Sequence, residues 1–393
     1  MRVPAPQCVA EDPQRQDPAA SLPRAPRRRR IRAGGDRATR GTDGVGVNET
    51  TPSTRRRILV TGPSGVIGRA LVEALSRHHV TGLVHADTEL PDVTEVVHGD
   101  LAKPLLGLTA SRWHELAERV DVVVHSGALT TWGKSRSRYQ EINIDGTERV
   151  LEFARRAGAP VHYLSTCFVH GIERTGLSNV AQDNVVRPYV WSKLEAERLI
   201  AASGVPYAVY RPTNLVGDSR TGASSRRQIV QVMSEFICRG KAPYLPAHPG
   251  NLLDFVPLDV TVDAVVRTLE ADDLRGQIEW LTYGTDAMTV AQARDILTEH
   301  AASLGRPLGD LRIVDPRRRL PVPLSELPPL TRSFLKVLID VSEMTHAAGG
   351  VLPSSKTELR ERLGVEFPSD RDAYRSSLKF WANETAVARA AER

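Results

Sequence analysis

The sequence predicts an α/β protein in which a Rossmann-like, doubly wound parallel sheet is followed by a smaller C-terminal cap. Three observations predict this fold. A glycine-rich turn separates a β-branched run at 58–61 from a helical periodicity that begins at Val66. Short apolar runs then alternate with amphipathic helical stretches up to residue 215. Beyond that point prolines become frequent and the alternation weakens. Regular alternation of strands and helices is typical of a parallel sheet with helices on both faces.

The first half of the chain supplies most of the expected elements. The predicted strands are short runs rich in β-branched and aromatic residues, at 58–61, 80–84, 95–98, 120–124, 161–165 and 207–210. The predicted helices repeat apolar residues every three or four positions, at 66–75, 111–118, 142–157 and 192–202. Strands that are joined through helices in this way pair in parallel.

The C-terminal part predicts fewer regular elements. Residues 254–259 read as a strand that returns to the core, 277–282 as a further edge strand, and 289–302 as a helix. Residues 332–346 form an amphipathic stretch. We therefore divide the chain into a disordered Arg/Pro-rich tail at 1–54, a nucleotide-binding core at 55–215 that also holds the catalytic residues, and a substrate-binding region at 216–393 that partly returns to the core.

Charge is unevenly distributed along the chain. The 393 residues carry 52 basic and 47 acidic side chains, a net charge of +5. Thirteen arginines and six of the acidic residues lie within residues 1–57, so the rest of the chain is close to neutral. Because a nucleic-acid-binding domain carries a basic patch or stripe, we expect no nucleic-acid partner.

Cysteine usage and hydropathy indicate the compartment. The three cysteines, Cys8, Cys167 and Cys238, are widely spaced and odd in number, which predicts neither a disulfide framework nor a metal site. No apolar run approaches the roughly 18 residues of a membrane span. The first twenty residues lack the apolar segment of a secretory signal. We expect a cytoplasmic protein without a membrane span or a bound metal.

The glycine-rich turn carries the clearest functional signal. It reads Thr61-Gly-Pro-Ser-Gly-Val-Ile-Gly68, with its glycines spaced G-x-x-G-x-x-G between a strand and a helix. Such a turn brings the backbone close to a pyrophosphate, and the helix N-terminus then offers free N–H groups and a positive dipole end. We therefore expect dinucleotide binding rather than a purely structural turn.

The choice between NAD and NADP depends on the end of the second strand. NAD sites usually place an acid there and NADP sites a base. His85 stands at this end and Asp87 follows two residues later, while Arg69 directly follows the last glycine of the turn. Arg69 is either a ligand of a 2′-phosphate or an exposed helix residue. NADP is favoured over NAD.

A second pattern indicates acid–base chemistry. Tyr189 and Lys193 are four residues apart, so on a helix they share a face and both can reach one pocket. A neighbouring ammonium favours the phenolate and lowers the pKa of a tyrosine. Thr166 follows an apolar strand, at the sheet edge where ligands bind. The three patterns follow one another along the chain: first the glycine turn, then the strand-end hydroxyl, then the helix with Tyr189 and Lys193. This order is what makes these residues candidates for acid–base chemistry.

From about residue 57 to residue 263 the chain resembles the extended short-chain dehydrogenase/reductase superfamily. The matching segments are TGPSGVIGR at 61–69, HGDLAKPLLGL at 98–108, VDVVVHSGALTTW at 120–132, NIDGTERVLEFA at 143–154, STCFVHG at 165–171, YVWSK at 189–193 and YRPTNLVGDSRTG at 210–222. The second and last of these are most similar to the thioester-reductase-like branch, which includes reductase domains of carboxylic acid reductases and peptide synthetases, and fatty acyl-CoA reductases.

The resemblance implies roles for individual residues. It implies that Thr166 orients the substrate, that Tyr189 is the general acid with Lys193 as its partner, and that Asn143 belongs to a proton relay. It also implies a set of cofactor contacts, namely Gly62, Ser64, Gly65, Val66, Ile67, Gly68, Arg69, His85, Asp100, Leu101, Ser126, Gly127, Ala128, Lys193 and Pro212. Asp100 and Leu101 match the adenine contact. Pro63 and His85 depart from the usual alanine and arginine, and His85 weakens the case for NADP.

The function implied is an NAD(P)H-dependent reductase of an acyl thioester, giving an aldehyde or alcohol. The thioester is expected to arrive as a CoA ester or on a separate acyl carrier protein. The alternatives are a dehydrogenase of a steroid-like secondary alcohol, a nucleotide-sugar epimerase or dehydratase, and a non-catalytic NADP-binding sensor or scaffold. The amphipathic stretch at 332–346 either lines a channel for an acyl chain or packs as ordinary core, and ordinary packing is favoured. The substrate and oligomeric state are left open by the sequence.

Overall fold

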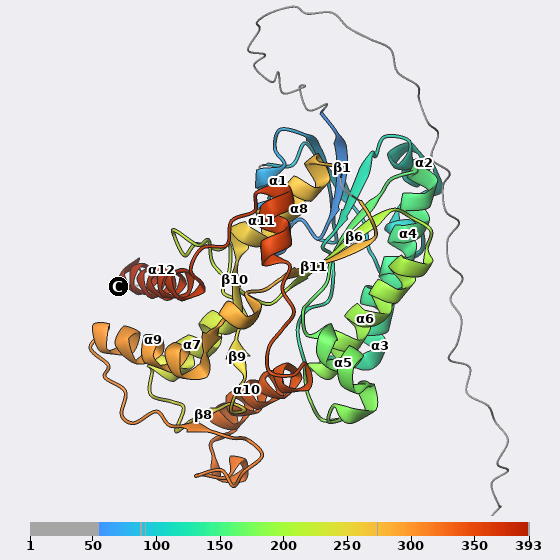
Figure 1. The fold of residues 1–393 in the computed structure, drawn as a ribbon. Helices are drawn as coiled ribbons and strands as arrows, with labels where there is room; N and C mark the ends of the chain where they lie inside the picture. Colours follow the sequence, from blue (N-terminus) through green and yellow to red (C-terminus); the bar gives the residue numbers. More distant parts are fainter. Residues whose placement is uncertain (1–54, 87–88, 91, 273, 392–393) are drawn as a thin grey trace, which may run out of the picture. The chain divides into compact units, whose positions relative to one another are not determined.

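The computed structural model describes residues 55–86, 89–90, 92–272 and 274–391 and has the predicted α/β fold (Figure 1). The predicted tail at 1–54 lies outside the described residues. A central sheet of seven parallel strands has the order β11-β6-β5-β4-β1-β2-β3. Its strands are β1 (Arg57–Thr61), β2 (His79–Val84), β3 (Glu95–His98), β4 (Val122–His125), β5 (Val161–Leu164), β6 (Tyr207–Pro212) and β11 (Gln277–Leu281).

The strand order reverses between β1 and β4, and this position determines where a ligand can bind. From β1 the sheet continues to β2 and β3 on one side and to β4, β5, β6 and β11 on the other. In such sheets the crevice for a ligand lies outside the carboxyl ends of the strands, at the reversal. The residues after β1, β4 and β5 are therefore placed at that edge, and the prediction of a doubly wound sheet is confirmed.

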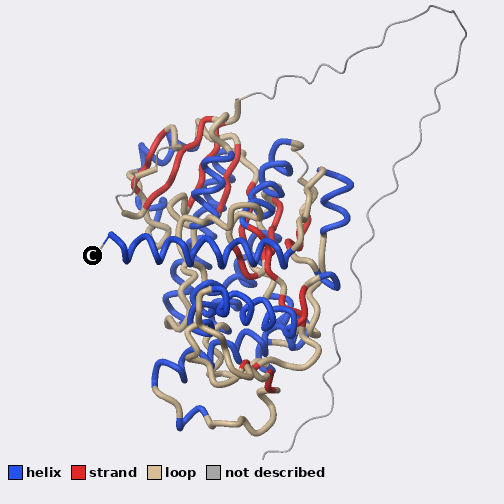
Figure 2. The backbone as a smooth tube through the Cα atoms, turned by 90° about the vertical axis from the view of Figure 1, so that its left-hand side faces the viewer, coloured by secondary structure: helices blue, strands red, loops and turns tan. Residues whose placement is uncertain are grey.

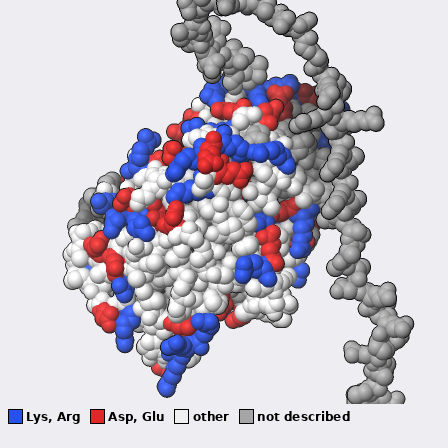
Figure 3. Space-filling view, in the orientation of Figure 1, with Lys and Arg blue, Asp and Glu red and all other residues white. Residues whose placement is uncertain are grey.

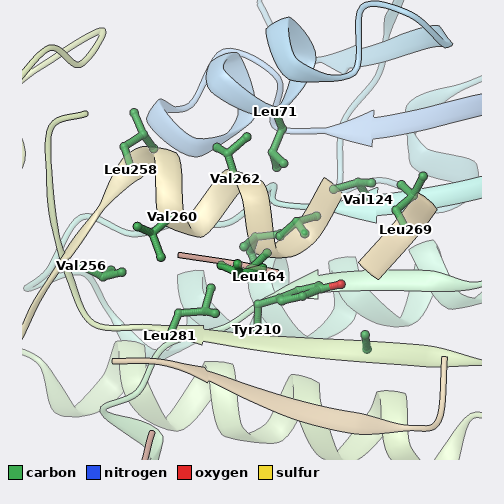
Figure 4. Packing of buried hydrophobic residues seen from close by; sticks show 14 of the residues in the cluster. Leu71, Val124, Leu164, Tyr210, Val256, Leu258, Val260, Val262, Leu269 and Leu281 are labelled. Atoms are coloured by element: carbon green, nitrogen blue, oxygen red, sulfur yellow. The ribbon is translucent and has the colours of Figure 1, made fainter. Parts of the chain in front are cut away.

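Helices cover both faces of the sheet. One face carries α1 (Val66–Ala74), α8 (Leu258–Glu270) and α11 (Lys356–Leu363), and the other carries α2 (Ala110–Ala117), α4 (Asp145–Ala157) and α6 (Arg187–Ala202). Figure 4 shows the first interface, where Val262 of α8 points toward Leu71 of α1 and Val260 points to the other side, toward Val256. Completely buried side chains on both faces make this sheet a rigid base for the loops at its edge.

The C-terminal part folds around a second apolar core. Its helices are α7 (Ile229–Cys238), α9 (Val290–Ser303), α10 (Pro329–Ala347) and α12 (Asp370–Ala391), and α5 (Val169–Thr175) packs on α10. Its strands are the pairs β7 (Asn214–Val216) with β10 (Phe255–Pro257), β8 (Leu245–Pro246) with β13 (Ile313–Val314), and β9 (Leu252–Leu253) with β12 (Met288–Thr289). Figure 2 shows α12 as a long helix, which packs against α7 and α9.

Three elements differ from the prediction. Helix α6 begins at Arg187 rather than at 192, because Pro188 occupies its first turn, where a missing N–H costs nothing. The helix predicted at 142–157 is divided: α3 (Arg136–Tyr139) and a π-helical turn at Gln140–Ile144 precede α4. The strand predicted within 254–259 does not join the central sheet, because β10 pairs with β7 in a separate two-stranded sheet.

The surface agrees with the neutral balance expected for the body of the chain. On the face shown in Figure 3, basic and acidic side chains are interleaved. Within the described ranges, no helix combines the length and apolarity that crossing a bilayer requires.

Candidate functional site

The glycine turn lies between β1 and α1 and leaves no room for side chains at two of its glycines. Gly62 has φ = +66°, and a Cβ on it would lie 2.6 Å from the Cα of Gly127. A Cβ on Gly68 would lie 2.1 Å from the carbonyl oxygen of Gly62. The turn is thus drawn tightly over the start of α1, whose first N–H groups have no partner within the helix. This is the arrangement that a pyrophosphate needs.

Two further loops meet the glycine turn. The first follows β3, where the N–H of Asp100 donates to the carbonyl of Leu106 over 2.7 Å. Leu105 and Leu106 hold left-handed φ angles of 53° and 57°, a strained conformation that fixes this fold-back. The second follows β4, where a Cβ on Gly127 would lie 2.9 Å from Leu101. The three loops therefore lie close together at the reversal of the strand order, and the close approach of their backbones at Gly62, Gly68 and Gly127 fits the binding of a dinucleotide.

We expect Gly68→Ala to weaken cofactor binding at least tenfold and to destabilise the fold by about 1–3 kcal/mol. The added methyl meets backbone atoms of Gly62 and Pro63, which cannot swing away as a side chain could. Fluorescence titration with NADPH and thermal unfolding measure the two effects. Gly309→Ala is the matched control, because a Cβ there meets nothing within 4 Å. Equal affinity in the two variants would contradict the role given to Gly68.

The predicted specificity residues lie at the surface beside these loops. The His85 side chain is 80% exposed, with its Nδ1 3.7 Å from Asp100 Oδ2. The Arg69 guanidinium donates to the carbonyl of Glu89 over 3.2 Å, on the segment that follows β2. Arg69 also lines an open groove between α1 and the loop at 218–225. Arg69 is thus held near the end of β2, while its charge remains available to a ligand.

The predicted catalytic residues come from β5 and α6. Thr166 is buried two residues beyond the end of β5, and Tyr189 is half-buried in α6. The Lys193 side chain is buried one helical turn after Tyr189, and its ammonium donates to the carbonyl of Leu164 over 2.5 Å. The same ammonium lies 4.1 Å from the centre of the Tyr163 ring. The lysine therefore ties the Tyr189 helix to the end of β5, two residues before Thr166.

The protonation of this group differs from the expectation. Burial lowers the pKa of Lys193 to about 7, opposed by the carboxylate of Glu197. Burial also raises the pKa of Tyr189 above its ordinary value, opposite to the direction predicted from its lysine neighbour. Desolvation is thus the largest cause of both shifts, and it disfavours the charged form of each group. Tyr189 stays protonated near neutral pH, which is the form that a proton donor needs.

Asn143 lies in the π-helical turn, and its amide links two segments of the site. Its Oδ1 accepts from the N–H of Leu129 over 2.7 Å, and its Nδ2 donates to Ser192 Oγ over 2.8 Å. The Ser192 hydroxyl in turn donates to the carbonyl of Tyr189 over 2.7 Å. Short π-helical turns of this kind are frequent at functional sites. Here the turn connects the loop after β4 with the Tyr–Lys helix.

His125, the last residue of β4, joins Asn143 to the glycine turn. Its Nδ1 lies 2.7 Å from Thr61 Oγ1 and its Nε2 lies 3.0 Å from Thr147 Oγ1. The Thr147 hydroxyl donates to the carbonyl of Asn143 over 2.6 Å. Burial lowers the pKa of His125 to about 3, so the ring is neutral. The chain of hydrogen bonds fixes the cofactor loop relative to the catalytic helix.

A buried ionic network behind the site was missed by the sequence analysis. The Arg211 side chain of β6 is fully buried and donates to Glu197 over 3.1 Å and to Glu173 over 2.6 Å. Glu197 also accepts from the hydroxyl of Ser165, the residue before Thr166. Glu197 stands one turn after Lys193 on α6. The sequence near α6 gives one sign of this network: Tyr189, Lys193 and Glu197 follow one another at intervals of four residues.

The remaining predicted cofactor residues lie in the same region. The turn and the start of α1 contain Ser64, Gly65, Val66 and Ile67, the loop after β4 contains Ser126 and Ala128, and β6 ends at Pro212. Ser126 Oγ donates to the carbonyl of Thr61 over 3.1 Å. Among the residues that the structure describes, no group of three or more histidines, cysteines and acids is arranged to hold a metal ion. Cys167 is buried, and burial raises the pKa of its thiol.

Sequence comparison finds a family model and several large synthetases that are similar to part of this chain. Residues 81–265 match the family model described as male sterility protein. A linear gramicidin synthase of Brevibacillus parabrevis is 27% identical over 324 residues, which span 67% of this chain and 6% of that protein. A hybrid PKS-NRPS synthetase of Penicillium oxalicum is 25% identical over 285 residues, again 67% of this chain and 6% of that protein. The chain thus corresponds to a small part of each of these relatives.

Structural comparison agrees. The terminal R domain of the myxalamid PKS-NRPS biosynthetic pathway has a TM-score of 0.64 and 23% identity, covering 85% of this chain and 92% of that one. The UDP-glucuronic acid 4-epimerase of Bacillus cereus, solved with NAD, has a TM-score of 0.56 and 17% identity, covering 83% and 99%. Identities this low show the fold alone. Together the comparisons confirm the resemblance to extended short-chain dehydrogenases/reductases of the thioester-reductase-like branch, and the predicted class of NAD(P)-dependent oxidoreductase.

Proposed function

We propose that this protein is an NADPH-dependent reductase that converts an acyl thioester, carried on CoA or on an acyl carrier protein, to an aldehyde. The observation that carries the proposal is the bond from the buried Lys193, one turn after Tyr189, to the carbonyl of Leu164, two residues before Thr166. It lies beside glycine loops that fit a dinucleotide. The similarity to synthetases and to a terminal R domain supports the thioester as substrate.

The residues of this chain would bind the substrate and move the proton. The hydroxyls of Thr166 and Tyr189 hydrogen-bond the carbonyl oxygen and stabilise the negative charge that develops there. Tyr189 donates its proton to that oxygen, and Lys193 binds the ribose beside it. When bound, NADPH supplies the hydride for the carbonyl carbon. Hydride and proton together give a hemithioacetal, which releases the thiol and leaves the aldehyde. A second round of the same reaction would give the alcohol.

A panel of acyl-CoA esters tests the proposal with purified protein and NADPH. We expect loss of NADPH absorbance together with formation of an aldehyde or alcohol and of one free thiol per turnover. Reduction of NAD⁺ by a secondary alcohol, or interconversion of nucleotide sugars without net oxidation, would replace this proposal with one of its alternatives. NADPH binding without turnover on any of these compounds would favour a sensor or scaffold.

Arg69→Ala is expected to remove the preference for NADPH. The guanidinium sits at the end of α1's first turn and near the end of β2, where a 2′-phosphate would lie. A charge-assisted contact to phosphate contributes about 1.5–3 kcal/mol, so NADPH should bind roughly ten- to a hundredfold more weakly. NADH serves as the internal control, because its affinity should not change. If both cofactors weaken equally, Arg69 acts on the turn rather than on the phosphate.

A further inference from the structure

A cavity of about 110 Å³ lies between α7, α10 and α12 and the short strands β8, β9 and β10. Its walls are mostly apolar side chains, among them Ile229, Val230, Met233, Ile237, Leu245, Leu253, Phe255, Val290, Leu297, Leu338, Val341 and Leu352. The residues lining it include no lysine or arginine. Its one carboxyl group, Asp254, accepts from the N–H groups of Tyr283 and Gly284 over 2.8 and 3.0 Å.

The hydroxyl groups in the wall are bonded within the protein. Ser234 donates to the carbonyl of Val230 over 2.7 Å, Thr213 to that of Asp254 over 2.9 Å, and Thr345 to that of Val341 over 3.2 Å. What the wall offers a ligand is therefore mainly hydrocarbon surface. A nucleotide sugar, with its diphosphate and many hydroxyls, would lose its hydration there without gaining comparable partners.

The cavity reaches a residue that lies next to the chain segment of Thr166. Thr213 directly follows β6, where the carbonyl of Pro212 accepts from the N–H of Cys167, the residue after Thr166. Leu352 lines the cavity and belongs to the apolar cluster against which both Val341 and Tyr189 pack. The cavity is thus separated from the segments that carry Thr166 and Tyr189 by neighbouring residues only.

We propose that this cavity binds the apolar tail of a short acyl group whose thioester carbonyl lies at Thr166 and Tyr189. This inference rests on the proposed function and adds the substrate class. A dry cavity of roughly 150 Å³ accommodates a benzene ring, so the present volume fits roughly four to six carbons. The amphipathic stretch at 332–346 was expected either to line a channel for an acyl chain or to pack as core. On this proposal it does both, because Leu338 and Val341 line the cavity while Leu335 packs in the apolar core.

A chain-length series of CoA esters from acetyl to palmitoyl tests the inference. Each buried methylene is worth about 0.8 kcal/mol, so kcat/KM should rise roughly fourfold per carbon up to about hexanoyl and then level off or fall. Met233→Trp fills the cavity and should abolish the rise, so that hexanoyl-CoA is reduced with no higher kcat/KM than acetyl-CoA. Val232→Trp is the matched control on the same helix, because Val232 is 36% exposed and Met233 only 8%. A flat series in the wild-type protein would overturn the inference and leave the proposed function standing.

Two further measurements separate the pocket from the chemistry. Leu338→Ala enlarges the cavity and should move the optimum to longer chains, even if Met233→Trp does not fold. Hexanamide, which cannot be reduced, should raise the melting temperature of the wild type and of Val232→Trp but not of Met233→Trp. Stabilisation in this pattern without reduction of any thioester would support the pocket while refuting the proposed function. No stabilisation of the wild type by hexanamide would count against the pocket.

Discussion

Replacing Tyr189 with phenylalanine is expected to lower kcat by about a hundred- to ten-thousandfold, which is the usual contribution of a positioned proton donor. Burial keeps the Tyr189 phenol protonated near neutral pH, so the wild-type group can give its proton to the carbonyl oxygen. Phenylalanine keeps the ring and its packing in the cluster that holds Val190 and Leu194. The affinity for NADPH should therefore change little, and steady-state kinetics together with a cofactor titration separate the two effects.

Tyr139→Phe is the matched control for this substitution. The two rings are neighbours, with centroids 6.3 Å apart, but the Tyr139 hydroxyl donates to the carbonyl of Thr131 over 2.7 Å. Its loss should cost about 1 kcal/mol of stability and have a small effect on kcat. If Tyr189→Phe were as active as this control, Tyr189 would have no place in proton transfer.

The fold could be predicted from local patterns because each strand and helix of the sheet carries its own periodicity. The run at 58–61, the glycine turn and the helix after Val66 are contiguous, so their order is visible without any tertiary information. The start of α6 was placed too late, at 192, although Pro188 is well suited to the first turn of a helix. Pairing of β10 with β7 depends on contacts far apart in sequence, which periodicity does not report.

In the candidate site, too, local sequence patterns indicate some of the residues, while others depend on tertiary contacts. Tyr189, Lys193 and the glycines are spaced by local geometry, so the sequence pointed to them. Arg211 and Glu197 are paired only because β6 and α6 are brought together by the fold. The protonation of Tyr189 was predicted in the wrong direction because the depth of burial, which decides it, is a tertiary property.

Glu197→Gln is expected to shift the pH dependence of kcat/KM toward lower pH. Lys193 carries its charge below its pKa of about 7 in the protein without ligand, so activity that needs the ammonium should fall as the pH rises through that value. The Glu197 carboxylate raises this pKa, because it favours the charged lysine. Without the carboxylate the lysine loses its proton at lower pH. A shift of one unit lowers kcat/KM about tenfold on the alkaline side.

The geometry gives this substitution a second consequence. The Glu197 carboxylate accepts a hydrogen bond from the hydroxyl of Ser165, the residue before Thr166. Because Glu197 lies one turn after Lys193 on α6, this bond fixes the end of β5 relative to that helix. Because Arg211 keeps Glu173 as a partner, the buried guanidinium is not left alone in the variant. Glu195→Gln is the control on the same helix, where the carboxylate pairs with Arg198 at the surface over 2.6 Å. A purely structural role for Glu197 predicts lower stability with an unshifted profile, and a profile superimposable on that of Glu195→Gln would exclude Glu197 from tuning Lys193.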